Sequence, residues 1–514
     1  MAATDTDTGN AFNVIERSVA DLQTAMSRGS VTSQGLVAAY LERIESIDRA
    51  GPRVNAVIEI NPDAMVIAAE LDRERAISGV RGPLHGIPIL IKDNIASADQ
   101  MQTTAGSLAM VGVKPIDDAF VVTQLRRAGA VILGKTNLSE WANFRSTRST
   151  SGWSARGGLT RNPYALDRTT SGSSSGSGAA IAASLATIAV GTETDGSIVS
   201  PSAANCLVGI KPTLGLVSRS GIIPIAASQD TAGPMARSVT DAALLLSVLA
   251  GSDTRDAITA EADAHATDYT KFLHAKGLRG ARIGVVRANF GGRNDLASAV
   301  VESALKVLAN EGAILIDVEL PNAGKYSASE TEVLTFELKA GLNAYLAGCA
   351  PGSTIRTLAD VIAFNERHRE KEMPFFGQEH FLCAQAKGGL DSKEYLDALA
   401  LNHRLSREEG IDKVMLAERL DALVAPSNGP AWLTDFIKGD NSGGGFSQPA
   451  AVAGYPHVTV PAGYVAGLPI GLSFVGRAWQ EGLLIRLAYG FEQATLHRRA
   501  PTYPASVQMP EFFD

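Results

Sequence analysis

The sequence predicts an α/β protein: a single large domain with a central, twisted, mostly parallel mixed sheet flanked by helices. Two observations support this fold class. Helix-like and strand-like patterns alternate, as in the helix over 117–128 before a strand over 130–133, and in the strand, helix and strand over 282–286, 297–310 and 313–318. The 514 residues are 45% hydrophobic and 19% charged, which supplies apolar material for one large core.

The first elements are predicted from caps and apolar spacing. About residues 1–15 are expected to form a flexible N-terminus, because the chain begins with a polar run. Thr32 precedes apolar residues at helical spacing, which is typical of a capped helix, and a further helix is expected over 62–78. An apolar strand over 89–91 follows and ends on Lys92.

The later part of the chain changes character. A helix is predicted over 238–249, and from about 324 to 420 the pattern is almost wholly helical and more charged. We expect this second region to be a helical insertion or cap that controls access to the site. Closing strands and a last amphipathic helix are predicted over 423–426, 457–460, 470–475 and 481–496.

Composition limits the classes of partner and compartment. The net charge of −8 and the lack of a basic run argue against nucleic acid as a partner. No apolar stretch reaches the length of a membrane span, so no membrane association is expected. Cys206, Cys349 and Cys383 lie far apart, without the spacing of a disulfide framework or a metal site. We expect a cytoplasmic monomer or homodimer without cofactor or metal, or a periplasmic protein if a signal peptide has been removed.

The most informative stretch runs from 170 to 212. Small residues fill 171–178, an apolar connector occupies 179–190, and a second polar turn covers 191–198. A flexible Ser/Gly linker is one interpretation of the first cluster. It continues directly into an apolar run, however, which favours an ordered loop whose glycines allow the backbone to approach a ligand closely.

Two familiar motifs match in letters but fail in context. Residues 129–136 fit the phosphate-binding pattern GxxxxGK[ST], but the four middle residues are themselves a predicted strand and leave no loop for phosphate. Residues 172–176 fit the GxSxG elbow, with Ser174 as nucleophile and His457 as the late histidine. That elbow follows a strand, whereas 162–170 is polar and contains proline, so this hypothesis is disfavoured.

A lysine can replace histidine as the base that activates a serine, provided that its amine is neutral near pH 7. This requires a fall in the lysine pKa from ~10.4 to ~7–8, which burial in an apolar wall can produce. The strand over 89–91 supplies such a wall for Lys92. The alternative is a surface lysine just past the edge of the strand.

Four segments together resemble the amidase signature family of serine hydrolases. They are residues 86–94, the Ser/Gly cluster, residues 191–201 and residues 208–213. The resemblance is dense from about 31 to 251 and returns over 449–492, and it implies that the whole chain, residues 1–514, is one domain with that family's fold.

The resemblance also implies roles for individual residues. The family uses a Ser, a second Ser held in a cis peptide, and a Lys, and its two serines are separated by 24 positions, as Ser173 and Ser197 are here. Ser197 then corresponds to the nucleophile, Ser173 to the bridging serine and Lys92 to the base. The backbone N–H groups of Thr194, Asp195, Gly196 and Ser197 would form the oxyanion hole. Many members have Gly where this chain has Asp195, whose carboxylate must therefore be turned away or neutralised.

Within the family, the segments 140–146, 191–197 and 228–235 are most similar to bacterial peptide amidases, which release ammonia from the C-terminal amide of a peptide. The resemblance thus implies a peptide amide or other small amide as substrate. The residues expected to bind it are Trp141, Asn143, Phe144, Ser174 and Asp195. Two alternatives stay open: an amidase for aryl or small acyl amides, and the A-type subunit of a glutamyl-tRNA amidotransferase complex.

Overall fold

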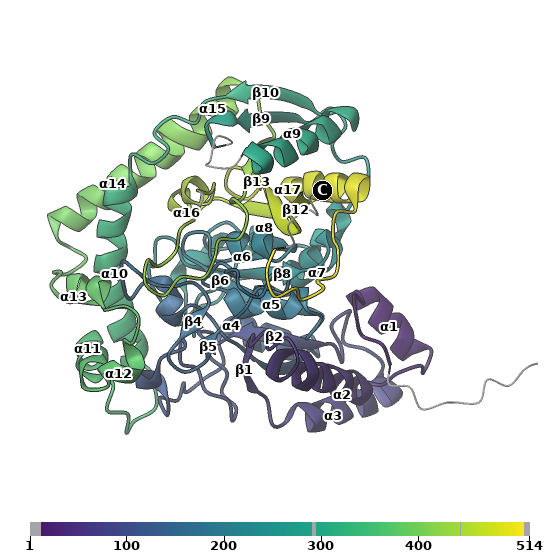
Figure 1. The fold of residues 1–514 in the computed structure, drawn as a ribbon, viewed down its shortest axis with the longest axis vertical. Helices are drawn as coiled ribbons and strands as arrows, with labels where there is room; N and C mark the ends of the chain where they lie inside the picture. The colour runs from purple at the N-terminus through teal and green to yellow at the C-terminus, as the bar shows by residue number, and fades with distance from the viewer. Residues whose placement is uncertain (1–11, 290–294, 443, 508–514) are drawn as a thin grey trace, which may run out of the picture.

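The computed structural model describes residues 12–289, 295–442 and 444–507, and its centre is a mixed sheet of 11 strands (Figure 1). The predicted single-domain α/β fold, with a mixed sheet between helices, is confirmed. In spatial order the strands are β1 (Val57–Ile60), β3 (Val131–Thr136), β2 (Pro88–Lys92), β6 (Ile188–Glu193), β8 (Thr231–Ala236), β7 (Val208–Lys211), β12 (His457–Val465), β13 (Leu468–Val475), β11 (Ala422–Pro426), β9 (Arg282–Val286) and β10 (Ile314–Val318). A small separate ribbon pairs β4 (Trp153–Ser154) with β5 (Gly158–Leu159).

The sheet contains fewer parallel pairs than the sequence predicts. Among the described strands, four of the ten neighbouring pairs are parallel: β3–β2, β2–β6, β11–β9 and β9–β10. The six others are antiparallel. The connections explain this correction. β12 and β13 form a hairpin closed by Ala466 and Gly467, both with positive φ, and β7 and β8 are joined by a loop without a crossover helix.

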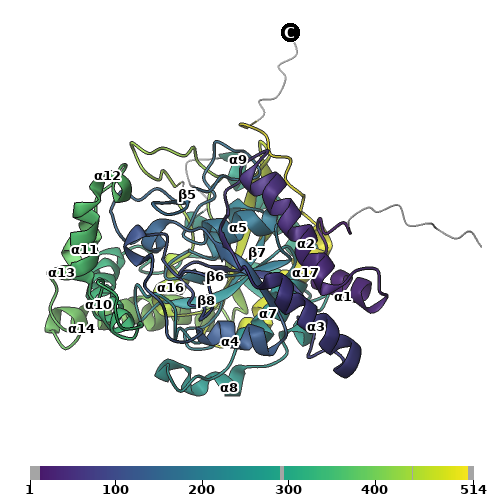
Figure 2. The ribbon, with the colours of Figure 1, turned by 90° about the horizontal axis from the view of Figure 1, so that it is seen from below.

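Helices cover the sheet and bury its central strands along their whole length. Figure 2 shows α5 and α7 on opposite sides of the central strands. The helices outside the insertion are α1 (Val19–Ser27), α2 (Ser33–Arg43), α3 (Ala64–Ser78), α4 (Phe120–Arg127), α5 (Ser175–Ala182), α6 (Val199–Ala204), α7 (Val239–Leu249), α8 (Ala262–His265), α9 (Asp295–Asn310), α16 (Gln448–Ala453) and α17 (Glu481–Thr495).

The predicted insertion is helical and forms an arm along one side of the molecule, drawn in green in Figure 1. It consists of α10 (Ser327–Ala347), α11 (Leu358–Arg367), α12 (Arg369–Glu372), α13 (Glu379–Gln385), α14 (Lys393–Ser406) and α15 (Asp412–Ala417). Its inner side packs on the loop after β3, where Leu138 and Trp141 share a buried cluster with Leu338, Leu342 and Phe381. Burying such side chains stabilises the contact by about 1.5–3 kcal/mol each.

A buried ion cluster also joins the arm to that loop. Arg145 Nη1 lies 2.7 Å from Glu140 Oε1 and 3.7 Å from Glu372 Oε2, and all three side chains are fully buried. Glu372 in turn accepts hydrogen bonds from Ser107 Oγ and the Leu108 amide. Since an unpaired buried charge is costly, these contacts fix the position of the arm on the loop.

Most of the predicted flexible N-terminus, residues 1–11, lies outside the described residues. Within the described part of that segment, Val14 is buried, and Glu16 just beyond it pairs with Arg498 at 2.8 Å. No helix in the described ranges has both the length and the apolar character needed to cross a membrane.

Candidate active site

Lys92, the predicted base, is the last residue of β2 and is fully buried. Its Nζ lies 2.7 Å from Ser173 Oγ, 2.9 Å from Thr192 Oγ1 and 3.2 Å from the Thr192 carbonyl oxygen. Burial lowers the pKa of Lys92 to about 7, although the Asp230 and Glu193 carboxylates oppose this shift. The amine therefore has the burial that a lysine base requires, and the surface alternative is excluded.

Burial alone does not single out this lysine. Lys135 and Lys211 are also fully buried, and burial lowers the pKa of each to about 8. Lys211 Nζ donates to the carbonyls of Pro212 and Tyr455, and Lys135 Nζ to the Ile95 carbonyl and Thr103 Oγ1. Of the three buried lysines, Lys92 is the one that contacts a serine hydroxyl.

The two predicted serines lie on adjacent loops. Ser173 is fully buried and follows a cis peptide bond from Gly172, as the resemblance implies. Ser197 lies between β6 and α6, and its carbonyl accepts a hydrogen bond from the Ser174 amide at 3.2 Å. This backbone contact brings the serine loops together. Both serines are in the described part of the chain, and no hydrogen bond joins their hydroxyls.

The loop 194–197 has the properties of an anion site. Its four backbone N–H groups donate to no acceptor among the described residues, so they remain available for a ligand oxygen. Glu193 fixes the end of the loop, because its Oε2 accepts from the amides of Ile198 at 2.7 Å and Val199 at 3.0 Å. On the other side, Asp230 accepts from Thr194 Oγ1 at 2.5 Å. Gly196 has φ +76°, and a Cβ there would come within 3.0 Å of Ser447 Oγ, which explains the glycine.

The carboxyl of Asp195 lies beside that of Glu330, and its Oδ1 is buried. Burial, together with the nearby Glu330 carboxyl, raises the pKa of Asp195 well above its usual range. Glu330 is buried on α10 and accepts hydrogen bonds from Gln229 Nε2 at 3.0 Å and Gln448 Nε2 at 2.7 Å. The raised pKa favours the neutral form of this carboxyl, which would limit its repulsion of negative charge beside the Asp195 amide.

The residues predicted to bind substrate differ in their exposure: some are buried in the core and others are partly exposed. Ser174 is fully buried, and among the described residues its hydroxyl bonds only the backbone of Thr192. Trp141 is buried edge-to-face against Phe381, at a centroid distance of 5.4 Å. These positions argue against the predicted substrate contacts of both. The sequence could not reveal this, because polar and aromatic residues in a loop serve equally well in a core.

Asn143 and Phe144 are partly exposed and closer to the expected role. Asn143 Nδ2 donates to Ser151 Oγ at 2.9 Å, while its Oδ1 is buried without a partner among the described residues. Phe144 stacks on His380 of the arm at 4.4 Å between centroids. Their contact with substrate stays a prediction.

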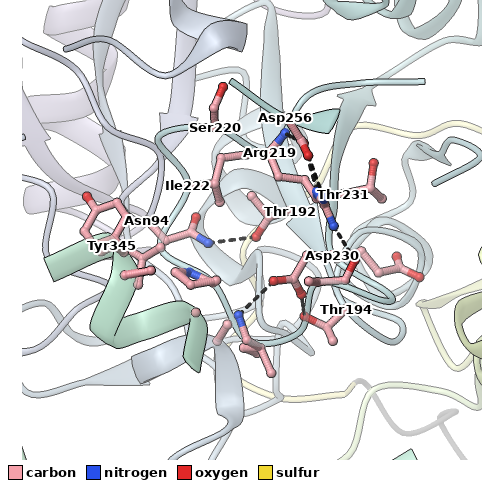
Figure 3. Close-up of a pocket in the computed structure, with 18 of the residues that line it drawn as sticks. Asn94, Thr192, Thr194, Arg219, Ser220, Ile222, Asp230, Thr231, Asp256 and Tyr345 are labelled. Atoms are coloured by element: carbon pink, nitrogen blue, oxygen red, sulfur yellow. Dashed lines mark hydrogen bonds and ion pairs between the residues drawn. The ribbon is translucent and has the colours of Figure 1, made fainter. Parts of the chain in front are cut away.

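A cavity of about 410 Å³ lies beside β6 and its following loop (Figure 3). The residues that line it include Asn94, Thr192, Ile222, Asp230 and Tyr345. Because Thr192 Oγ1 contacts Lys92, the cavity ends one side chain away from the predicted base. Sequence reasoning gave Asn94, Thr192 and Asp230 no role, although each lies in or next to a segment that carries the family resemblance.

The alternative based on Ser174 and His457 is contradicted. His457 is fully buried on β12, and its Nε2 lies 2.5 Å from Ser473 Oγ of the neighbouring strand. The imidazole of His457 and the hydroxyl of Ser174 therefore belong to separate hydrogen-bond networks. No elbow of that kind exists here.

Comparison with known proteins agrees with this geometry. A family model described as Amidase matches residues 35–485. The crystal structure of native peptide amidase from Stenotrophomonas maltophilia is 53% identical, covers 95% of this chain and 99% of its own, and has a TM-score of 0.91. The crystal structure of the peptide amidase PAM in complex with the competitive inhibitor chymostatin is 52% identical and has a TM-score of 0.93. It covers 95% of this chain and 100% of its own. A probable amidase of Arabidopsis thaliana is 42% identical over 507 residues, 96% of this chain and 93% of the relative. The chain belongs to the amidase family and is an amide hydrolase.

Proposed function

We propose that this protein is a peptide amidase that hydrolyses the C-terminal carboxamide of a peptide to the free acid and ammonia. The observation that carries the proposal is the 2.7 Å contact of a buried lysine with Ser173, in a chain 53% identical to a peptide amidase over 95% of its length. The likeness supports the peptide substrate, and the contact supports the chemistry.

The proposed reaction begins with attack of Ser197 Oγ on the carboxamide carbon. The Ser197 proton passes to Ser173, whose own proton passes to the neutral Lys92 amine. The negative oxygen of the tetrahedral intermediate accepts hydrogen bonds from the free N–H groups of the loop 194–197. Lys92 returns the proton through Ser173 to the departing nitrogen, which leaves as ammonia. Water then cleaves the acyl-enzyme by the same proton route and releases the acid.

This relay requires one local movement. Since the hydroxyls of Ser173 and Ser197 do not hydrogen-bond in this structure, one of them turns toward the other when substrate binds. The movement proposed is a rotation about χ1 of one serine between staggered positions. Hydrogen bonds of catalytic groups often tighten in this way only in the substrate complex.

The test is hydrolysis by the purified chain alone. A peptide amide is incubated with the protein, ammonia is measured, and the product is identified by mass spectrometry. We expect the free acid, with internal peptide bonds intact. An anilide and a small aliphatic amide are assayed in parallel, as is glutamine as ammonia donor. Preference for the anilide by more than tenfold in kcat/KM, or activity that needs partner chains and glutamine, would refute the peptide-amidase proposal in favour of one of the two alternatives.

A further inference from the structure

Within the described part of the chain, the amine of Lys92 has three hydrogen-bonding oxygen neighbours. One is Ser173 Oγ at 2.7 Å, and the other two belong to a single residue: Thr192 Oγ1 at 2.9 Å and the Thr192 carbonyl oxygen at 3.2 Å. Lys92 and Thr192 are 100 positions apart in the chain and meet because β2 and β6 are neighbours in the sheet. Thr192 therefore supplies two of the three contacts that orient the predicted base.

A neutral amine has two N–H donors and one lone pair. If both N–H groups donate to the two oxygens of Thr192, the lone pair is directed at the remaining neighbour, Ser173 Oγ. This is the arrangement that proton abstraction from Ser173 requires. The pKa of Lys92, lowered to about 7 by burial, is consistent with a neutral amine at working pH.

Thr192 is itself held on two sides. Ser174 fixes its backbone, because Ser174 Oγ donates to the Thr192 carbonyl at 3.0 Å and accepts from the Thr192 amide at 3.2 Å. Asn94 Nδ2 donates to Thr192 Oγ1 at 3.0 Å, as the dashed line in Figure 3 shows. With Lys92 and Asn94 as donors, both lone pairs of the hydroxyl are used. Its proton is then free to point into the cavity that Thr192 lines.

We propose that Thr192 is a positioning residue, which directs the lone pair of Lys92 toward Ser173, and that Asn94 holds the Thr192 hydroxyl in the accepting orientation. The inference rests on the proposed function, since it takes Lys92 as the base. It assigns a purpose to the contacts of Ser174 and Asn94, which the proposed relay itself does not use.

The test replaces Thr192 by valine, which keeps the branched shape and removes the hydroxyl. Without Thr192 Oγ1, one N–H loses its acceptor and the amine can turn away from Ser173. We expect kcat at the pH plateau to fall about 10- to 100-fold, which is part of the 10²- to 10⁴-fold that a positioned base contributes. Thr192→Ser restores the acceptor and should restore most of the activity. Asn94→Leu should lower kcat by less than Thr192→Val.

The pH profile separates positioning from general damage. Hydrogen bonds to a charged donor are stronger than those to a neutral one, so loss of Thr192 Oγ1 disfavours protonated Lys92 and lowers its pKa. Because the neutral amine is the active form, the acid limb of kcat/KM should move to lower pH in Thr192→Val while the plateau falls. A merely loosened structure does not produce this combination.

Thr187→Val is the matched control. Thr187 is a fully buried threonine directly before β6, and its Oγ1 hydrogen-bonds Tyr40 OH at 3.0 Å. This variant should lose stability without a shift of the acid limb. Thermal unfolding of all variants, compared with the wild type, shows that they fold.

The rate of inactivation by phenylmethylsulfonyl fluoride at each pH provides a second measurement that needs no amide substrate. It reports the nucleophilicity of the active serine. We expect Thr192→Val to react about 10- to 100-fold more slowly than the wild type. An unchanged plateau, or a limb that moves to higher pH, would overturn the inference. An increase in kcat would also overturn it, because Thr192 would then be competing with Ser173 for the lone pair.

Failure of the inference differs from failure of the proposed function. If Lys92→Ala is inactive and Thr192→Val matches the wild type, the positioning role fails and the triad stands. If Lys92→Ala keeps full activity, the triad itself fails. If the wild type hydrolyses another amide and no peptide amide, the proposed substrate fails, and Thr192 is tested on the amide that is cleaved.

Discussion

Replacing Lys92 by methionine should abolish turnover and at the same time stabilise the folded protein near pH 7. The reason is the cost of a buried amine. The pKa of Lys92 is about 7 in the fold and ~10.4 in the unfolded chain, so between these pH values the unfolded state binds one more proton. In that window the stability of the wild type falls as pH falls, by about 1.4 kcal/mol per pH unit, and the deficit sums to roughly 4–5 kcal/mol at pH 7.

Methionine removes this deficit but also removes three hydrogen bonds, to Ser173 and to the two oxygens of Thr192. At about 1 kcal/mol each, their loss offsets some 3 kcal/mol. We therefore expect Lys92→Met to be more stable than the wild type by about 1–2 kcal/mol at pH 7. The advantage should disappear as pH rises toward 10, where the unfolded lysine also loses its proton.

The assay is denaturant unfolding of both proteins at several pH values between 7 and 10. Lys135→Met is the matched control, because Lys135 is equally buried, its pKa is lowered to about 8, and it contacts no triad residue. The stability of Lys135→Met relative to the wild type should change with pH in the same direction but by less, and this variant should keep its turnover. The reasoning is refuted if the stability difference between Lys92→Met and the wild type does not change with pH.

Three further predictions concern catalysis and the arm. Ser197→Ala should abolish hydrolysis and Ser173→Ala should reduce kcat by several orders of magnitude, measured as ammonia release; full activity of either contradicts its assigned role. The acid limb of kcat/KM in the wild type should have an apparent pKa of about 7, with activity falling tenfold per pH unit below it, because protonated Lys92 cannot act as base; a flat profile down to pH 5 contradicts this. Arg145→Met should destabilise the fold by about 3–5 kcal/mol, since it leaves Glu140 and Glu372 buried without their cation; a denaturant midpoint equal to that of the wild type contradicts this.

The local sequence pattern was sufficient to predict many of the elements of the fold. The apolar strand that ends at Lys92, the small-residue loop with Ser173 and the helical arm from about 324 to 420 all follow from neighbouring residues. The direction of strand pairing could not be predicted in this way, because the antiparallel contact of β7 with β8 depends on the path of the long loop between them. The same limit applied to Trp141, whose burial depends on Phe381 of the arm.

By itself, the sequence predicted the candidate catalytic side chains: a lysine at the end of an apolar strand, and two serines at the family's spacing. Only the tertiary structure decided how these groups are oriented. Lys92 meets Ser173 and Thr192 across 81 and 100 positions of chain, and such contacts arise from strand order rather than from local pattern. The physical reason is that burial and hydrogen-bond partners set the pKa and the direction of an amine, and both are properties of the packed molecule.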